Sequence, residues 1–297
     1  MKTLFLAALI ALLAGCAATG PRLDHSLSAV GQSSRVKFIV IHYTVSDLPR
    51  SINILTRQQV SSHYLLTDTA KPFSYALVDE TRRAYHAGVS NWKSYTNLNS
   101  SSIGIEIVNP GYTDTPEGRL WHPYPQAQID QLIVLLQDIV LRHAIAPDDI
   151  LAHSDIAPQR KSDPGPLFPW HQLAAAGLIT WPDATRVAST RVVFERQLPD
   201  VSWFQRQLAA HGYAVPQTGE LDQATRNVIT AFQMKYRPAL FDGAPDAQTA
   251  ALLYALTGAS LPVSASAPVP MSVPMSVPMP VSTPMPMLEP ASLEPME

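Results

Sequence analysis

Cysteine is almost missing from this sequence, because its 297 residues include one, Cys16. An intramolecular disulfide is therefore excluded. An excess of charge of one sign is also missing, since the formal net charge is −3. A chain so close to neutral gives no sign of a nucleic-acid surface or of a strongly anionic partner. The N-terminal apolar run, residues 4–14, is too short to span a bilayer as a helix.

That apolar run follows the basic Lys2 and precedes small residues, a pattern typical of a secretory signal. Leu13-Ala14-Gly15-Cys16 resembles the bacterial lipoprotein signal, in which the cysteine becomes the lipidated first residue of the mature chain. Position 17 lacks the aspartate that commonly retains such lipoproteins in the inner membrane. We therefore expect a lipid anchor on Cys16 in the outer membrane, facing the periplasm. A plain signal peptide or a buried thiol is the alternative.

Composition and pattern divide the chain into six segments. We predict a signal peptide (1–15), a lipidated tether (16–34), an α/β domain (35–181), a linker (182–198), a helical domain (199–258) and a disordered tail (259–297). The tail is so rich in proline that it favours extended chain and cannot pack a core. Its methionines are soft ligands, so copper binding is an alternative to a plain spacer.

The α/β domain is predicted from strands mixed with one long helix. VKFIVIHYT (36–44) reads as a strand buried on both faces, and SIGIEIVN (102–109) alternates with a period of two. Residues 73–80 and 83–86 are expected to form a hairpin. Apolar residues at helical spacing predict a helix over 126–143.

After residue 198 the pattern becomes helical. Helices are predicted over 201–211, 223–236 and 247–256, the first ending at Gly212 and the others capped by Asp222 and Asp246. We expect them to form a small, separate three-helix module.

The segment 151–170, LAHSDIAPQRKSDPGPLFPW, gathers charged groups among four prolines and cannot be a regular helix or a central strand. His153 and Asp163 lie in it, and His42 ends an earlier strand. Taken alone, each has an ordinary explanation, such as a satisfied core histidine or a turn-forming aspartate. Without further information, His42, His153 and Asp163 are compatible with a metal site and with purely structural roles.

Five segments, in order, resemble the zinc-dependent N-acetylmuramoyl-L-alanine amidases of the amidase-2 group, which share their fold with peptidoglycan-recognition proteins. They are IVIHYT, SSHYLLTD, YHAGVSNW, SIGIEIVN and AHSDIAPQRKSDPGP. The resemblance covers about residues 35–170 and is nearest to the AmiD-like lipoproteins. It implies an α/β fold with a mixed central sheet flanked by helices.

The resemblance also implies a set of site residues. His42, His153 and Asp163 would bind one zinc ion, a ligand set that leaves a position open for water. Glu106 would act as general base and then as general acid, and Lys161 would stabilise the oxyanion. Six further residues are expected to contact the substrate, and the alternative for each is that it fills the structure or caps a loop. These residues are His63, His86, Asn91, Trp92, Asn109 and Arg160.

The C-terminal helices resemble the three-helix peptidoglycan-binding domain, in which Phe232-Gln233 and the Asp222–Thr225 turn carry the match. A generic helical cap is the alternative. The sequence thus predicts a zinc amidase that acts on peptidoglycan or muropeptides, cutting between N-acetylmuramic acid (or its anhydro form) and L-alanine. A non-catalytic recognition protein and a zinc peptidase of the stem peptide are the rival hypotheses.

Overall fold

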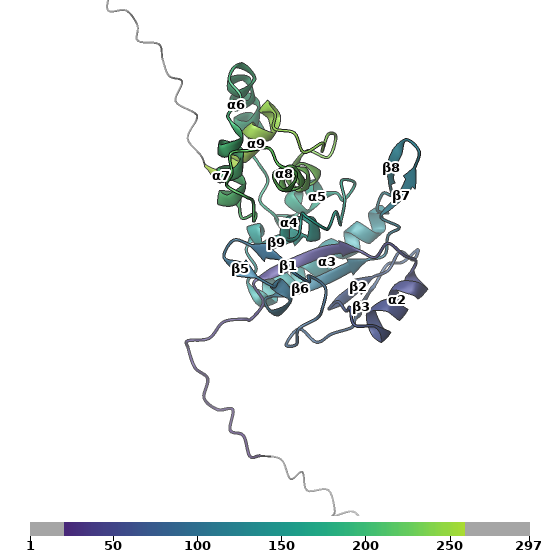
Figure 1. The fold of residues 1–297 in the computed structure, drawn as a ribbon. Coiled ribbons are helices and arrows are strands. Elements are labelled where there is room, and N and C mark those ends of the chain that lie inside the picture. The colour runs from purple at the N-terminus through teal and green to yellow at the C-terminus, as the bar shows by residue number, and fades with distance from the viewer. Residues whose placement is uncertain (1–20, 259–297) are drawn as a thin grey trace, which may run out of the picture. The chain divides into compact units, whose positions relative to one another are not determined.

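The computed structural model describes residues 21–258, so Cys16 and the proline-rich tail lie outside the described residues. The centre is a five-stranded sheet in the order β3-β2-β6-β1-β9 (Figure 1). Its strands are β1 (Phe38–Tyr43), β2 (Tyr64–Leu66), β3 (Ser74–Ala76), β6 (Ser102–Ile107) and β9 (Ile150–Ala152). Only β3 runs antiparallel to its neighbour, so the mixed sheet predicted from the sequence is confirmed.

The central strands are buried on both faces, which explains their β-branched, nearly continuous apolar sequence. Alternate residues point to opposite faces. Isoleucines such as Ile39, Ile41 and Ile105 pack with Leu132 and Leu136 of helix α3. Helix α3 (Gln126–His143) has the bounds predicted from its apolar spacing, and α5 (Trp170–Ala175) adds Trp170 and Leu173 to the same core.

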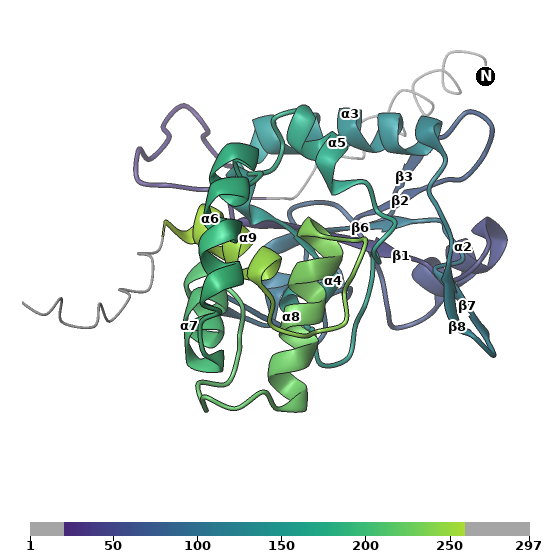
Figure 2. The ribbon, with the colours of Figure 1, turned by 90° about the horizontal axis from the view of Figure 1, so that it is seen from above.

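The C-terminal helices pack against the β1 and β9 part of the opposite face, and α2 (Leu48–Arg57) packs against Leu65 of β2 on the same face (Figure 2). The C-terminal helices are α6 (Ala184–Arg196), α7 (Val201–His211), α8 (Gln223–Tyr236) and α9 (Ala247–Thr257), with the one-turn α4 (His153–Ile156) next to α8. Phe38 and Leu151 of the sheet belong to the same apolar cluster as Phe232 and Leu253. The predicted helices are therefore present, but they share a core with the sheet and do not pack as a separate module. The domain boundaries drawn from the sequence stay a prediction.

Two local expectations differ from the structure. The expected linker, 182–198, contains α6, which is capped by Asp183. The expected hairpin is wrong, because β3 pairs with β2 and residues 83–86 form no strand. The predictions also missed α2 (Leu48–Arg57) and two small hairpins. These are β4 (Asn91–Trp92) with β5 (Tyr95–Thr96), and β7 (Tyr112–Thr115) with β8 (Gly118–Trp121). Among residues 21–258, no helix combines the length and apolar character needed to cross a bilayer.

Candidate metal centre and active site

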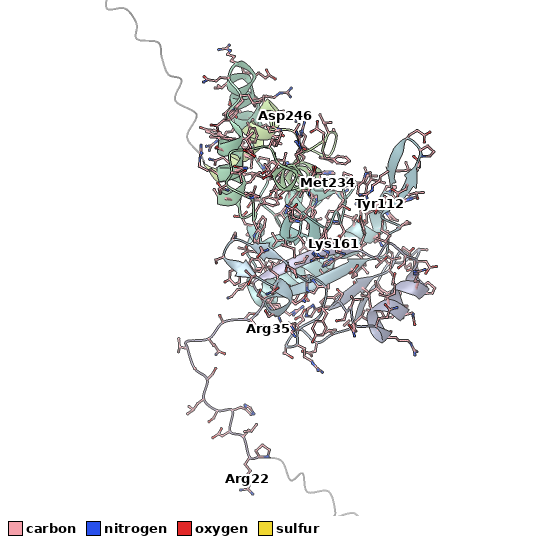
Figure 3. The ribbon with its side chains drawn as sticks, viewed as in Figure 1. Arg22, Arg35, Tyr112, Lys161, Met234 and Asp246 are labelled. Carbon is pink, nitrogen blue, oxygen red and sulfur yellow. The ribbon has the colours of Figure 1, made fainter. Side chains whose placement is uncertain are left out.

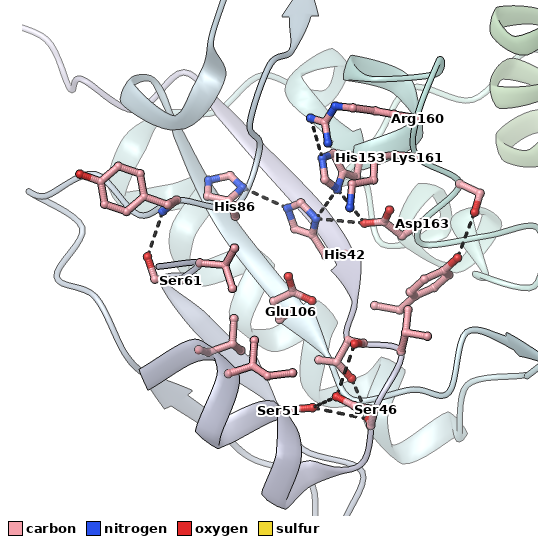
Figure 4. Close-up of a pocket in the computed structure, with 18 of the residues that line it drawn as sticks. His42, Ser46, Ser51, Ser61, His86, Glu106, His153, Arg160, Lys161 and Asp163 are labelled. Atoms are coloured by element: carbon pink, nitrogen blue, oxygen red, sulfur yellow. Dashed lines mark hydrogen bonds and ion pairs between the residues drawn. The ribbon is translucent and has the colours of Figure 1, made fainter. Parts of the chain in front are cut away.

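Three neighbouring strands bring polar side chains to one edge of the sheet. His42 lies near the end of β1, Glu106 is its register partner on β6, and His153 directly follows β9. Because parallel strands end at the same edge, these side chains meet there. Together with Lys161 and Asp163 they line a cavity of about 340 Å³ (Figure 4).

His42, His153 and Asp163 form a tight, buried cluster. The two Nδ1 atoms lie 2.9 Å apart, and Asp163 Oδ2 lies 3.0 Å from His42 Nδ1 and 2.9 Å from His153 Nδ1. The three residues are between 1% and 6% exposed. Each thus offers one ligand atom to a common point.

The surrounding hydrogen bonds fix which imidazole nitrogens carry protons. His153 Nε2 lies 3.2 Å from Ala87 O, and because a carbonyl only accepts, this nitrogen donates. Ser102 Oγ donates to Leu98 O over 2.6 Å and therefore accepts from His86 Nε2.

His86 Nδ1 then accepts from His42 Nε2 over 3.0 Å. Both ligand histidines are thereby left with an unprotonated Nδ1 that faces the carboxylate. Two lone pairs and an anion at one point repel each other unless a cation lies between them. The donor set therefore fits a metal ion such as zinc, with outer partners orienting each imidazole.

The charges of the cluster agree with this fit. Burial, and then the charge of His153, lower the pKa of His42 to about 4, although Asp163 opposes the shift. Burial raises the pKa of Asp163, but the charges that His153 and His42 carry when protonated, and the hydrogen bonds that the protonated rings donate, outweigh burial and hold that pKa well below its usual range. At neutral pH the cluster thus contains a neutral His42 and an ionised carboxylate, the forms that bind metals.

Glu106 lies in the same cavity without a hydrogen-bond partner. Its Oε2 is buried, and no donor among residues 21–258 reaches it. Burial, and then the charge of Asp163, raise the pKa of Glu106 well above its ordinary value, while Lys161 opposes the shift. A carboxyl group with a raised pKa suits both the uptake and the release of a proton near neutral pH.

Lys161 lines the cavity two residues before Asp163 (Figure 4). In Figure 3 it lies where the sheet meets the helical layer, below Met234. Its position next to the cluster suits an ammonium group that stabilises negative charge on a bound carbonyl oxygen.

The expected substrate contacts divide into two groups. His86 and Arg160 do line the cavity. The His86 ring is bonded to His42 and Ser102, however, and the Arg160 guanidinium donates to Val89 O and Ala87 O. His86 has little exposed surface, at 9%, whereas Arg160 is exposed, so its expected contact with substrate stays a prediction.

The other four expected contacts do not line the cavity. His63 is fully buried, accepts from Gly104 N and donates to Arg82 O. Trp92 is 2% exposed and packs on Tyr213. Asn109 bonds Pro123 O and Gly111 N, which is the loop-capping alternative. Asn91 begins the β4–β5 hairpin away from the cavity.

Sequence reasoning missed two residues that orient the site. Ser102 ends the hydrogen-bond chain from His42, and Asn99 Oδ1 accepts from the backbone N–H groups of His86 and Ala87. Ser102 is the first residue of β6 and Asn99 lies in the turn before it, and no local sequence pattern marks these two as functional.

Comparison with known proteins agrees with this geometry. Residues 32–166 match the family described as N-acetylmuramoyl-L-alanine amidase, and residues 197–253 match the putative peptidoglycan binding domain. The chain is 44% identical over 266 residues to N-acetylmuramoyl-L-alanine amidase AmiD of Escherichia coli K12, covering 85% of this chain and 96% of AmiD.

Two solved structures are similar over most of the chain. AmiD of E. coli, in complex with the substrate anhydro-N-acetylmuramic acid-L-Ala-D-γ-Glu-L-Lys, has a TM-score of 0.73 and 43% identity, covering 80% of this chain and 95% of that one. AmpDh3 of Pseudomonas aeruginosa has a TM-score of 0.75 and 38% identity, covering 80% and 98%. The ordered motifs, the buried His-His-Asp cluster and these likenesses agree, and the chain belongs to the N-acetylmuramoyl-L-alanine amidase family.

Proposed function

We propose that this chain hydrolyses the amide bond between N-acetylmuramic acid, or its 1,6-anhydro form, and L-alanine, with one zinc ion held by His42, His153 and Asp163. The observation that carries the proposal is the meeting of two Nδ1 atoms and a carboxylate oxygen next to Glu106, which has no partner among the described residues, in an open cavity. When bound, zinc supplies Lewis-acid polarisation and makes water more acidic.

The roles of the chain's own residues follow from their positions. Glu106 takes a proton from the attacking water and returns it to the nitrogen of the departing alanine. Lys161 stabilises the negative charge that develops on the lactyl carbonyl oxygen. His86 and Ser102 keep the His42 Nδ1 atom unprotonated, so that this ligand is ready to bind.

Mass spectrometry of a defined muropeptide tests the proposal. We expect the zinc-loaded chain to release intact stem peptide, and Glu106→Gln to bind zinc normally but to turn over about 10²- to 10⁴-fold more slowly. Asp163→Ala should lose both zinc and activity. Glu117→Gln, an exposed change in the β7–β8 hairpin, is the matched control. A Glu106→Gln variant with full activity and bound zinc would refute the role given to Glu106.

The same masses separate the rival functions. Shortened stem peptides would indicate a zinc peptidase. Binding to sacculi without any cleavage would indicate a recognition protein. All three ligand positions hold residues able to bind zinc, which favours catalysis over recognition alone.

We also propose that the C-terminal helices bind peptidoglycan and that a lipid on Cys16 anchors the chain in the outer membrane, facing the periplasm. The match of residues 197–253 supports the first part, and Leu13-Ala14-Gly15-Cys16 supports the second. Labelling with a radioactive fatty acid should mark the wild type and not Cys16→Ser. Labelling of both would contradict the anchor.

A further inference from the structure

A buried ionic network lies directly below the turn that carries His153. Asp155 in α4 is fully buried, and Lys235 in α8 is 5% exposed. The ammonium group of Lys235 lies 2.8 Å from Asp155 Oδ2 and 4.4 Å from the centre of the Trp170 ring. Tyr213, which follows α7, donates to Asp155 Oδ1 over 2.6 Å. Tyr213 and Lys235, both from the C-terminal helical layer, therefore bind the carboxylate of Asp155, which lies next to the sheet.

This network completes the edge of the sheet. β9 is an edge strand, so its outward backbone groups have no strand partner among the described residues. Lys235 donates to Ile150 O over 3.2 Å, and Asp155 Oδ2 accepts from Ala152 N over 2.9 Å. The side chains of Lys235 and Asp155 thus bind backbone groups of β9 just before His153. Asp155 itself lies two residues after His153.

The same helix also contacts the loop between the two ligands. Gln159 donates to Ala224 O over 3.0 Å, and Asn227 donates to Gln159 Oε1 over 2.8 Å. α8 therefore contacts the ligand-bearing segment both at the turn of His153 and midway to Asp163. A ligand atom must be held within a few tenths of an ångström for tight metal binding.

We infer that Lys235 and Tyr213 are positioning residues of the metal centre, and that the helical layer sets metal affinity as well as contacting the cell wall. They act through Asp155, which fixes the turn that presents His153 Nδ1. The inference rests on the proposed function for the identity of the metal. It predicts that zinc affinity depends on the helical layer even when no peptidoglycan is present.

The test measures zinc affinity of the full chain by chelator competition, together with the absorption spectrum of the cobalt-substituted protein. Lys235→Met should weaken zinc binding by about tenfold or more and change the cobalt spectrum, the scale seen for outer partners of metal ligands. Tyr213→Phe should weaken binding by a smaller factor, since it removes a hydrogen bond and leaves the ion pair.

A double variant supplies the rescue. Asp155→Asn with Lys235→Met removes both charges, while the introduced amide keeps an acceptor for Ala152 N and a group to bond Tyr213. Most of the lost affinity should return. Arg191→Met is the matched control, because it removes an exposed cation paired with Glu195 on α6.

Zinc affinities within about twofold of the wild type for folded Lys235→Met and Tyr213→Phe would overturn the inference. If Lys235→Met does not fold, Tyr213→Phe alone decides. Because zinc affinity is measured without substrate, a failure of the positioning inference can be distinguished from a failure of the proposed function. A wild type that binds zinc but cleaves no muropeptide would refute the proposed function and leave the positioning inference standing.

Discussion

Gly104 gives the sharpest prediction, because a single added methyl group there should disturb the metal centre. A Cβ atom at Gly104 would lie 2.4 Å from His86 Cγ and 2.6 Å from His86 Nδ1. Carbon atoms in contact need about 3.5 Å, so in Gly104→Ala the imidazole has to retreat by about 1 Å. That ring is the hydrogen-bond partner of His42 Nε2, at 3.0 Å.

The cost has two parts. Overpacking a filled interior costs about 1–3 kcal/mol. A buried imidazole N–H that loses its acceptor costs a further ~1–3 kcal/mol. We therefore expect Gly104→Ala to lower the free energy of unfolding by about 2–6 kcal/mol. Zinc affinity should fall by about 10- to 100-fold, because His42 loses the partner that orients it.

Urea unfolding and chelator competition measure the two effects. Gly31→Ala is the control, since a Cβ atom there meets nothing within 4 Å. Adding His86→Ala to Gly104→Ala makes room for the methyl group, so stability should partly return while zinc affinity stays low. A Gly104→Ala protein with unchanged stability and zinc affinity would refute the reasoning.

Three further predictions concern protons and metal. Burial raises the pKa of Glu80, but hydrogen bonds from Arg142, Tyr64 and His143 outweigh it and lower that pKa to about 2. Its stabilisation is complete above pH 4.5 and is lost as the pH falls toward 2, so Glu80→Gln should flatten acid unfolding curves in this range. Burial lowers the pKa of His211 from 6.5 to about 4. The free energy of unfolding should therefore fall as the pH is lowered from 6.5 to 4, and this fall should be smaller in His211→Gln. Chelation should lower the Tm by removing ligand stabilisation of about 2.7 kcal/mol at a zinc concentration of 100 Kd, and should leave the Tm of Asp163→Ala unchanged.

Much of the metal centre was predictable from sequence because its residues come from strand ends and from one proline-rich loop. The length of β1 and β6 follows from their apolar runs, and the motifs give the order of the ligands. The residues alone left the metal site open, and the resemblance to the amidase-2 group supplied the set of ligands. The parallel pairing of the strands explains why His42, Glu106 and His153 meet. Strands β1 and β6 and helix α3 follow from the same local patterns, whereas the mixed sheet followed from the resemblance.

Trp92 shows why the burial of an expected substrate contact could not be predicted from the sequence. An aromatic residue after a histidine-containing loop suits a sugar platform equally well. Whether it is exposed depends on what covers it, and Gly212 and Tyr213 lie more than a hundred residues later in the chain. His63 and Asn109 are similar, since their partners are backbone groups whose positions only the complete fold defines.

The shared core also sets how binding and cutting are related in space. Two domains joined by a flexible linker sample many separations, so the bound domain only raises the local concentration of the other. Here α6 occupies the place of the expected linker, and Phe38 packs in one cluster with Phe232. The distance between a glycan bound to these helices and the metal centre would therefore be fixed. Cleavage along a glycan strand should then recur at a preferred spacing from the bound sugars, and exchanging the helical layer for that of another amidase should fail unless the turn of His153 is exchanged with it.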